Sequence, residues 1–167
     1  MKPSSYLIIW GIAVIASHTS MAVPKSLPVP RFVTIKFNEV NVRVGPDKNF
    51  PVTWVFVRAK EPVEIVAEHE QWRKILDVEG EGGWVHSNAL SGKRSIIINS
   101  KQEVHLFSTS DDADNQIIAH LKPNLRCELL KCKKELCKIT CKGASDKAIT
   151  GWASRKHLWG VYPEEWM

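Results

Sequence analysis

The sequence lacks the features that would assign it at once to a membrane, helical or nucleic-acid-binding class. Its longest apolar run, residues 6–16, has 11 residues, and as a helix it would span about 16 Å of the roughly 30 Å needed to cross a bilayer. No segment of helix length shows the 3.6-residue hydrophobic period of an amphipathic helix. The charge is nearly balanced, with 23 Lys and Arg against 18 Asp and Glu, so the composition predicts no nucleic-acid partner.

The sequence also lacks a recognisable set of catalytic residues. It has no evident Ser, His and Asp triad and no cysteine at all before Cys127. We therefore expect a protein that is not an enzyme and that needs no metal or cofactor. The histidines that follow residue 22 are scattered: His69, His86, His105, His120 and His157.

Residues 1–22 have the organisation of a secretory signal peptide. Lys2 supplies the positive start, residues 6–16 the apolar core, and Ser20 and Ala22 the small residues before a cleavage site. An uncleaved membrane anchor is the alternative, which the short apolar run disfavours. We expect export to the periplasm, cleavage after Ala22, an extended proline-containing leader at residues 23–32, and no stable membrane insertion after cleavage.

Beyond this leader the chain consists of short alternating apolar runs separated by turn residues. Such runs predict β-strands of four to seven residues, packed as a small barrel or sandwich. Gly45-Pro46 and Gly82-Gly83 are interpreted as turn residues. The alternating residues of the first three runs are Val40, Val42 and Val44; Val52, Trp54 and Phe56; and Val63, Ile65 and Ala67.

An internal repeat appears when the chain is aligned with itself at a constant offset. Glu39-Val40 then aligns with Glu103-Val104, and Lys74-Ile75 with Lys138-Ile139. With a four-residue insertion in the second copy, Gly83-Trp84 aligns with Gly151-Trp152. The repeat predicts two tandem β-barrels, at residues 33–92 and 93–163, followed by a short tail at 164–167.

The first copy carries motifs of a known family. Residues 41–46 (NVRVGP), 62–68 (PVEIVAE), 72–75 (WRKI) and 83–86 (GWVH) resemble, in order and spacing, the bacterial SH3-like domain. The segments at 31–33, 90–94 and 158–163 further resemble exported tandem-SH3 proteins of Gram-negative bacteria. The resemblance implies two small all-β SH3-like barrels, an envelope location and a binding role without an established reaction. The second copy departs from the pattern, with residues 107–110 (FSTS) at the Arg-x-Gly-Pro corner and Leu136 in place of Trp72.

Three residues of the first copy are candidates for ligand binding. Arg43 could pair with a carboxylate, although a solvated arginine at a strand end is the simpler interpretation. Trp54 and Trp72 could be recognition platforms, although Trp54 shares a face with Val52 and Phe56 and so could belong to the core. The expected ligand is cell-wall peptide or an extended segment of an envelope protein, held at a barrel groove or edge. A periplasmic protein scaffold is the alternative, and a cell-wall hydrolase accessory or an enzyme is the least favoured one.

The four cysteines all fall in one short segment of the second copy, from Cys127 to Cys141, and an exported chain meets an oxidising compartment. In an antiparallel hairpin that turns near residues 133–135, the residue numbers of two positions that face each other add up to nearly the same value along the whole hairpin. The nested pairs Cys132–Cys137 and Cys127–Cys141 give sums of 269 and 268, so we predict these two disulfides, with a bulge or a looser turn that absorbs the difference of one. Zinc is the alternative, but the spacing is not that of a zinc ribbon.

The two copies differ in charge. Residues 33–92 carry 7 basic and 9 acidic groups, whereas residues 96–162 carry 11 and 7. Five lysines crowd one hairpin of the second copy, where they could favour an anionic polymer or a lipid headgroup, or simply keep a sheet edge from aggregating. They are Lys131, Lys133, Lys134, Lys138 and Lys142.

Export can be tested on the protein from its native host. Cleavage after Ala22 predicts an intact mass that begins at Val23, found in the periplasmic fraction. A membrane-bound chain that still carries Met1 would contradict the signal peptide.

Overall fold

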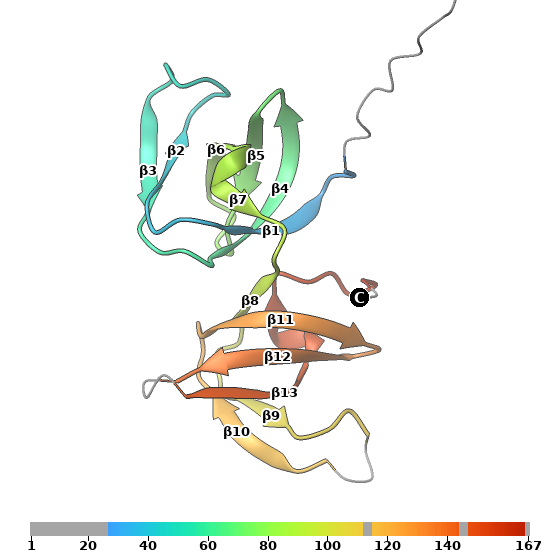
Figure 1. The fold of residues 1–167 in the computed structure, drawn as a ribbon. Helices are drawn as coiled ribbons and strands as arrows, with labels where there is room; N and C mark the ends of the chain where they lie inside the picture. Colours follow the sequence, from blue (N-terminus) through green and yellow to red (C-terminus); the bar gives the residue numbers. More distant parts are fainter. Residues whose placement is uncertain (1–26, 112–114, 144–146, 166–167) are drawn as a thin grey trace, which may run out of the picture.

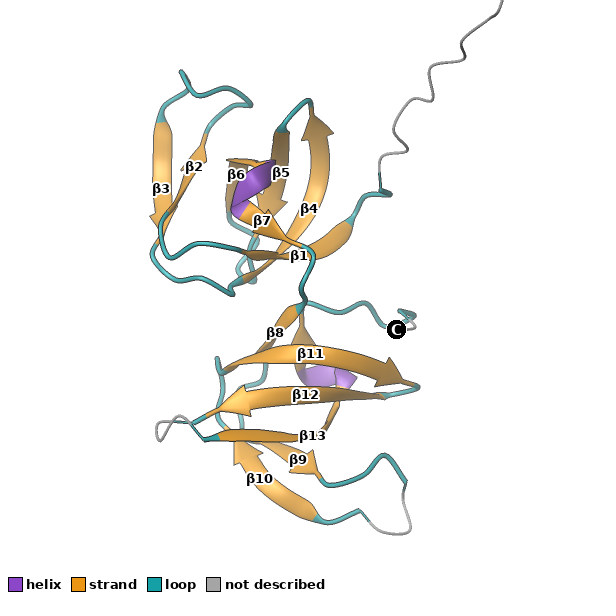
Figure 2. Ribbon diagram, in the orientation of Figure 1, coloured by secondary structure: helices purple, strands orange, loops and turns teal. Residues whose placement is uncertain are grey.

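The computed structural model describes residues 27–111, 115–143 and 147–165 (Figure 1). These residues form two antiparallel sheets of seven strands each, without α-helix (Figure 2). The predicted all-β fold of two successive small domains is therefore confirmed. The proposed signal peptide and its cleavage site lie outside the described residues. Within those ranges, no helix is long and apolar enough to cross a membrane.

The first sheet has the strand order β3-β2-β6-β5-β4-β1-β7. Its strand β1 begins two residues before the predicted start of the first barrel, and a 3₁₀ turn (Ser87–Ala89) leads into β7. The strands are β1 (Arg31–Ile35), β2 (Val40–Arg43), β3 (Val52–Phe56), β4 (Pro62–His69), β5 (Trp72–Leu76), β6 (Gly82–His86) and β7 (Leu90–Ser91).

The second sheet repeats this arrangement with the order β10-β9-β13-β12-β11-β8-β14. Each strand has the same place in its sheet as the strand whose number is lower by seven has in the first sheet. A 3₁₀ turn (Arg155–His157) again precedes the last strand. The strands are β8 (Ser95–Ile98), β9 (Val104–Phe107), β10 (Ile117–Leu121), β11 (Arg126–Lys133), β12 (Leu136–Lys142), β13 (Ala148–Ser154) and β14 (Leu158–Trp159).

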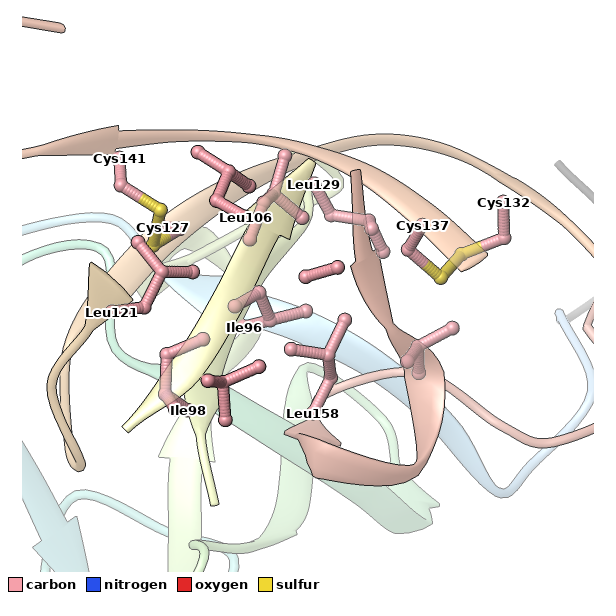
Figure 3. Close-up of a cluster of buried hydrophobic side chains, with 14 residues drawn as sticks. Ile96, Ile98, Leu106, Leu121, Cys127, Leu129, Cys132, Cys137, Cys141 and Leu158 are labelled. Carbon is pink, nitrogen blue, oxygen red and sulfur yellow. A yellow bond between two sulfur atoms is a disulfide. The ribbon is translucent and has the colours of Figure 1, made fainter. Parts of the chain in front are cut away.

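Each sheet curls around its own apolar core. In β2, Val40 and Val42 are buried while Asn41 faces solvent, as the two-residue period of a half-buried strand requires. The first core is centred on Ile35, Val42, Val63, Ile75 and Val85, and the second on Ile96, Ile98, Leu106, Leu121 and Ile139 (Figure 3).

The glycines of β6 correct one sequence-based interpretation. Gly82 and Gly83 lie inside a strand rather than in a turn. A Cβ on Gly83 would come within 2.7 Å of the carbonyl oxygen of Arg43, and one on Gly151 within 2.5 Å of the carbonyl oxygen of Phe107. The two glycines therefore allow β6 and β13 to approach the backbones of β2 and β9, which any larger residue would push away.

The long hairpin of each barrel contains one extra residue at the same place. The register of β4 with β5 shifts between Ile65 and Ala67, and that of β11 with β12 between Leu129 and Lys131. Before the second shift Cys127 faces Cys141, and after it Cys132 faces Cys137. Of the two explanations that the cysteine numbers left open, a bulge or a looser turn, the structure shows the bulge.

The structure joins the cysteines in the predicted pairs. Cys127 bonds to Cys141 and Cys132 to Cys137, with Cα–Cα distances of 4.4 and 4.0 Å. All four sulfur-bearing residues are buried, and the two bonds flank the second core on either side of its aliphatic side chains (Figure 3). The first core has no such bond among its described residues.

The chain after β14 returns to the first barrel and joins the two domains. The Tyr162 hydroxyl donates to Glu64 Oε1 over 2.6 Å. The centroid of the Phe32 ring lies 4.7 Å from the ring centroid of Tyr162 and 5.0 Å from that of Trp159. A second link joins the Arg126 Nε to both carboxylate oxygens of Glu61 at 3.0 Å. The barrels therefore share a packed junction rather than a free linker.

Glu165, expected to belong to a tail, strengthens this junction. Its carboxylate accepts two hydrogen bonds from the Arg94 guanidinium, at 2.5 and 3.1 Å. Burial alone would raise the pKa of Glu165, but the hydrogen bonds from Arg94 and the Tyr162 backbone, with the nearby positive charges, outweigh it and lower the pKa. Burial, followed by the bond to Glu64, raises the pKa of Tyr162.

The disulfides should stabilise the second barrel to different degrees. The chain-entropy estimate is about 3 kcal/mol for the fifteen-residue loop closed by Cys127–Cys141 and about 2 kcal/mol for the six-residue loop closed by Cys132–Cys137. Replacing each pair by alanines and measuring urea unfolding should give losses in that order. Non-reducing peptide mapping is the control on the parent protein, and four free thiols or bound zinc would contradict the pairing.

The junction should fail when the Tyr162 ring is removed. Tyr162→Ala should give a more extended scattering profile in solution with both barrels still folded, whereas Tyr162→Phe loses only one hydrogen bond, about 1 kcal/mol. Unchanged scattering of Tyr162→Ala would contradict a packed junction.

The contribution of Glu165 to the stability of the folded protein depends on pH. Because the folded pKa of Glu165 lies below the ordinary 4.5, this contribution is complete above that pH and is lost as the pH falls through the lowered pKa.

Candidate functional site

A depression on the first barrel brings together two of the three residues predicted to bind a ligand. It has a volume of about 220 Å³ and lies where the β1–β2 connection, the outer face of β2 and the adjoining ends of β5 and β6 meet. Arg43 and Trp72 both line it. The remaining lining residues are Phe37, Glu39, Val40, Asn41, His86, Asn88 and Ala89.

Arg43 is positioned by the end of β2. Because Val42 is fully buried, the next side chain points to the outer face. The Arg43 Nη1 donates to the carbonyl oxygen of Phe50 over 2.7 Å, which anchors one corner of the guanidinium. Its other nitrogens make no hydrogen bond to the described residues. They remain available to a carboxylate or a peptide carbonyl.

Trp72 and His86 form the opposite side of the depression. They are directly paired across β5 and β6, and their rings meet edge to face with centroids 5.4 Å apart. The His86 Nδ1 also lies 2.8 Å from Asn88 Oδ1 and 3.3 Å from the Asn88 backbone nitrogen, where it caps the 3₁₀ turn. The imidazole is thus held against the half-buried indole, and together they present an aromatic surface with polar edges.

Trp54 does not join this depression. It lies on β3 directly opposite Val42, a fully buried residue of the first core. Opposite residues of an antiparallel pair share a face, so Trp54 points toward the core side of the sheet. It packs against that core, and its ring centroid is 4.3 Å from that of Phe56. A core position for Trp54 is the alternative that the alternating pattern of β3 left open.

Sequence inspection missed His86, Phe37 and Asn88 as members of the site. The alternation of β6 places His86 on the outer face, because Gly83 and Val85 are buried. That signal could have identified an outward histidine. It could not have shown that His86 stands beside Trp72, since the neighbour is set by the register of two strands.

The second barrel has no copy of this site. The residue that occupies the position of Arg43 is Phe107, and Leu136 faces Ser154 where Trp72 faces His86 in the first barrel. The guanidinium, the indole and the imidazole are therefore all replaced. Recognition by this combination of groups belongs to the first barrel alone among the described residues.

Another depression, of about 320 Å³, lies between the barrels. Its charged groups largely satisfy one another: Glu61 accepts from Arg126 and lies 3.7 Å from Arg58. It is a feature of the junction rather than a second copy of the site. In the described ranges, no three histidine, cysteine or acidic side chains are grouped as metal ligands would be.

Comparison with known proteins finds a similarity for the first barrel. Residues 36–92 match the family described as the bacterial SH3 domain. Among solved structures, the chain is similar to NlpC2 from Trichomonas vaginalis, with 16% sequence identity over 84% of this chain and a TM-score of 0.34. The chain covers 51% of that protein, about half its length. No curated protein matches the sequence.

The matched segment includes every residue that lines the depression. It also covers the motifs at 41–46, 62–68, 72–75 and 83–86 on which the resemblance was based. Residues 36–92 of this chain are therefore similar to the bacterial SH3 domain.

Proposed function

We propose that this protein is a non-catalytic binding module of the cell envelope, and that its first barrel recognises cell-wall peptide. The observation that carries the proposal is the joint placement of Arg43, Trp72 and His86 in one depression of a bacterial SH3 domain. The protein acts in the periplasm after removal of its signal peptide. The family match and the two buried disulfides support an exported protein.

The chemistry of the depression suits a short peptide of mixed charge. The guanidinium of Arg43 binds a peptide carboxylate, while Glu39 on the neighbouring connection offers a partner to an amino group. Trp72 supports the aliphatic part of the peptide by contact with its ring. Asn41 and Asn88 offer amide groups to the peptide backbone. A site that combines these groups binds by orientation and contact and needs no bound metal or cofactor.

A protein scaffold is the second candidate, favoured by one observation. Strand β3 is the last strand of its sheet, so one side of its backbone has no neighbouring strand among the described residues. Val52, the first residue of β3, is 41% exposed, and Val57, directly after the strand, is 82% exposed. An extended segment of a partner protein could add to such an edge through backbone hydrogen bonds. This route does not use Arg43 or Trp72, so the two candidates are separable by mutation.

The proposal predicts that Trp72→Ala weakens binding to purified sacculi. Loss of an aromatic anchor at an interface typically costs about 1–3 kcal/mol, equivalent to about 5- to 150-fold in affinity. Arg43→Ala should weaken binding by a similar amount, and more at low than at high salt because it removes an ionic contact. Co-sedimentation of the purified protein with sacculi over a concentration series measures both effects.

The repeat supplies matched controls. Leu136→Ala and Phe107→Ala make comparable truncations at the corresponding positions of the second barrel and should leave sacculus binding unchanged. Trp54→Ala should lower the melting temperature, because the ring packs on the core, but should not change the affinity of the folded fraction. Circular dichroism of each variant separates lost binding from lost folding.

Two results would overturn the proposal. Absence of co-sedimentation of the folded parent protein with sacculi at low salt would favour the protein scaffold. Release of soluble wall peptides by the purified protein would show that it is an enzyme.

A further inference from the structure

The long hairpins of the two barrels have the same geometry but opposite charge. The turn residues Glu70 and Lys134 share a positive φ, 47° and 52°, and both hairpins contain the single bulge described above. Residues 62–78 of the first hairpin carry two basic and four acidic side chains. Residues 126–142 of the second carry six and two. The difference therefore lies in the side chains and not in the backbone.

The bulge of the second hairpin exposes a leucine beside the lysines. Leu129 and Cys132 are buried, so the two residues between them both face outward. These are Leu130, which is 45% exposed, and Lys131. An apolar side chain in water beside basic ones is the pattern of a surface that meets the boundary between lipid headgroups and acyl chains.

The lysines of this surface are largely unengaged. Lys133 and Lys134, at the turn, are exposed, and the ion pairs between described residues include none with Lys131, Lys133 or Lys134. Lys131 instead lies 5.7 Å from the centre of the Trp152 ring. Lys131 also faces Lys138 across β11 and β12, so like charges stand together without compensation.

Protection of a sheet edge does not account for this charge. Lys138 lies on β12, which is paired on both sides, with β11 and β13. Among the described residues, neither the end of β4 nor that of β11 has a strand paired on its outer side, because β1 pairs only as far as Ile65 and β8 only as far as Glu128. Yet Ala67 and His69 stand in β4 where Lys131 and Lys133 stand in β11. A barrel of this shape is therefore built without the lysines.

We propose that the end of the β11–β12 hairpin, formed by Leu130, Lys131, Lys133, Lys134 and Lys138, docks on an anionic lipid surface. The lysines supply attraction to negatively charged headgroups, about fivefold in affinity for each. Leu130 inserts at the headgroup boundary. The buried Cys132–Cys137 bond holds the hairpin end in one conformation, so docking needs no folding step. The depression of the first barrel belongs to the other domain and is not part of this surface.

The first hairpin provides the residues for a variant that removes the positive charge of the second. Lys131→Ala, Lys133→His and Lys134→Glu together install the residues that the first hairpin carries at these positions. Flotation of the full protein with vesicles of phosphatidylglycerol and phosphatidylcholine, against phosphatidylcholine alone, measures docking. The parent protein should bind the anionic vesicles only, binding should fall as salt rises, and the triple variant should bind about 100-fold more weakly.

Two controls locate the effect. Lys48→Glu, Lys60→Asn and Lys93→Ala together change the net charge by the same amount at exposed positions outside the hairpin and should leave binding within about twofold. Leu130→Gln should weaken vesicle binding several-fold and leave binding to soluble polyphosphate unchanged, since only the vesicle offers an apolar layer. Circular dichroism and non-reducing peptide mapping verify that each variant is folded and cross-linked.

Three results would overturn the proposal. One is the absence of binding of the folded parent protein to anionic vesicles at low salt. Another is an equal loss of binding in the two triple variants, which would make the attraction a matter of net charge. The third is unchanged vesicle binding of Leu130→Gln together with tight binding to polyphosphate, which would identify a soluble polyanion as the partner.

Discussion

The register of one long hairpin in each barrel is the constraint on which most of this structure depends. In β4–β5 and in β11–β12 a single extra residue shifts the pairing by one. In the second barrel the shift allows cysteine pairs on both sides of the bulge to face each other across the strands. It also turns Leu130 and Lys131 outward together. In the first barrel the register places Trp72 opposite His69 on one side and His86 on the other.

The same framework thus carries two different surfaces. The first barrel has Arg43, Trp72 and His86 around one depression, and the second has Phe107, Leu136 and Ser154 in their places. The second barrel instead has two disulfides and a basic hairpin. A small β-domain is only marginally stable by size, and the cross-links allow like charges to gather on the second hairpin without loss of the fold. In the functions that we propose, recognition belongs to the first domain and electrostatic docking to the second.

The junction joins these surfaces into one body. Phe32 of the first strand packs against Trp159, the last residue of β14, and against Tyr162, which follows that strand. Tyr162 adds a hydrogen bond to Glu64, and Glu165 one end of an ion pair with Arg94. A short connection between β7 and β8 alone would leave the barrels free to turn. The returning C-terminal segment restricts that motion.

Local patterns in the sequence predicted much of this. Alternation of apolar residues located three strands of the first barrel, and the internal repeat predicted a second small β-domain. The cysteine numbers predicted both disulfide pairs, with a bulge or a looser turn between them. The interpretation of Gly82-Gly83 as a turn was wrong because a glycine pair is equally required where two backbones approach closely. For Trp54 the alternation left core and surface both open, since it states which residues share a face but not which face is buried.

The sequence by itself therefore predicted strands of the first barrel, a second small domain and the cross-links, because each depends on residues close together in the chain or on a constant offset in residue number. Only the tertiary structure decided which outward residues become neighbours. Arg43, Trp72 and His86 lie on three strands, and the barrel brings them together through β-pairing and curvature that no local period contains. The junction around Phe32 has the same origin, because its partners come from opposite ends of the described chain and meet only after both barrels have formed.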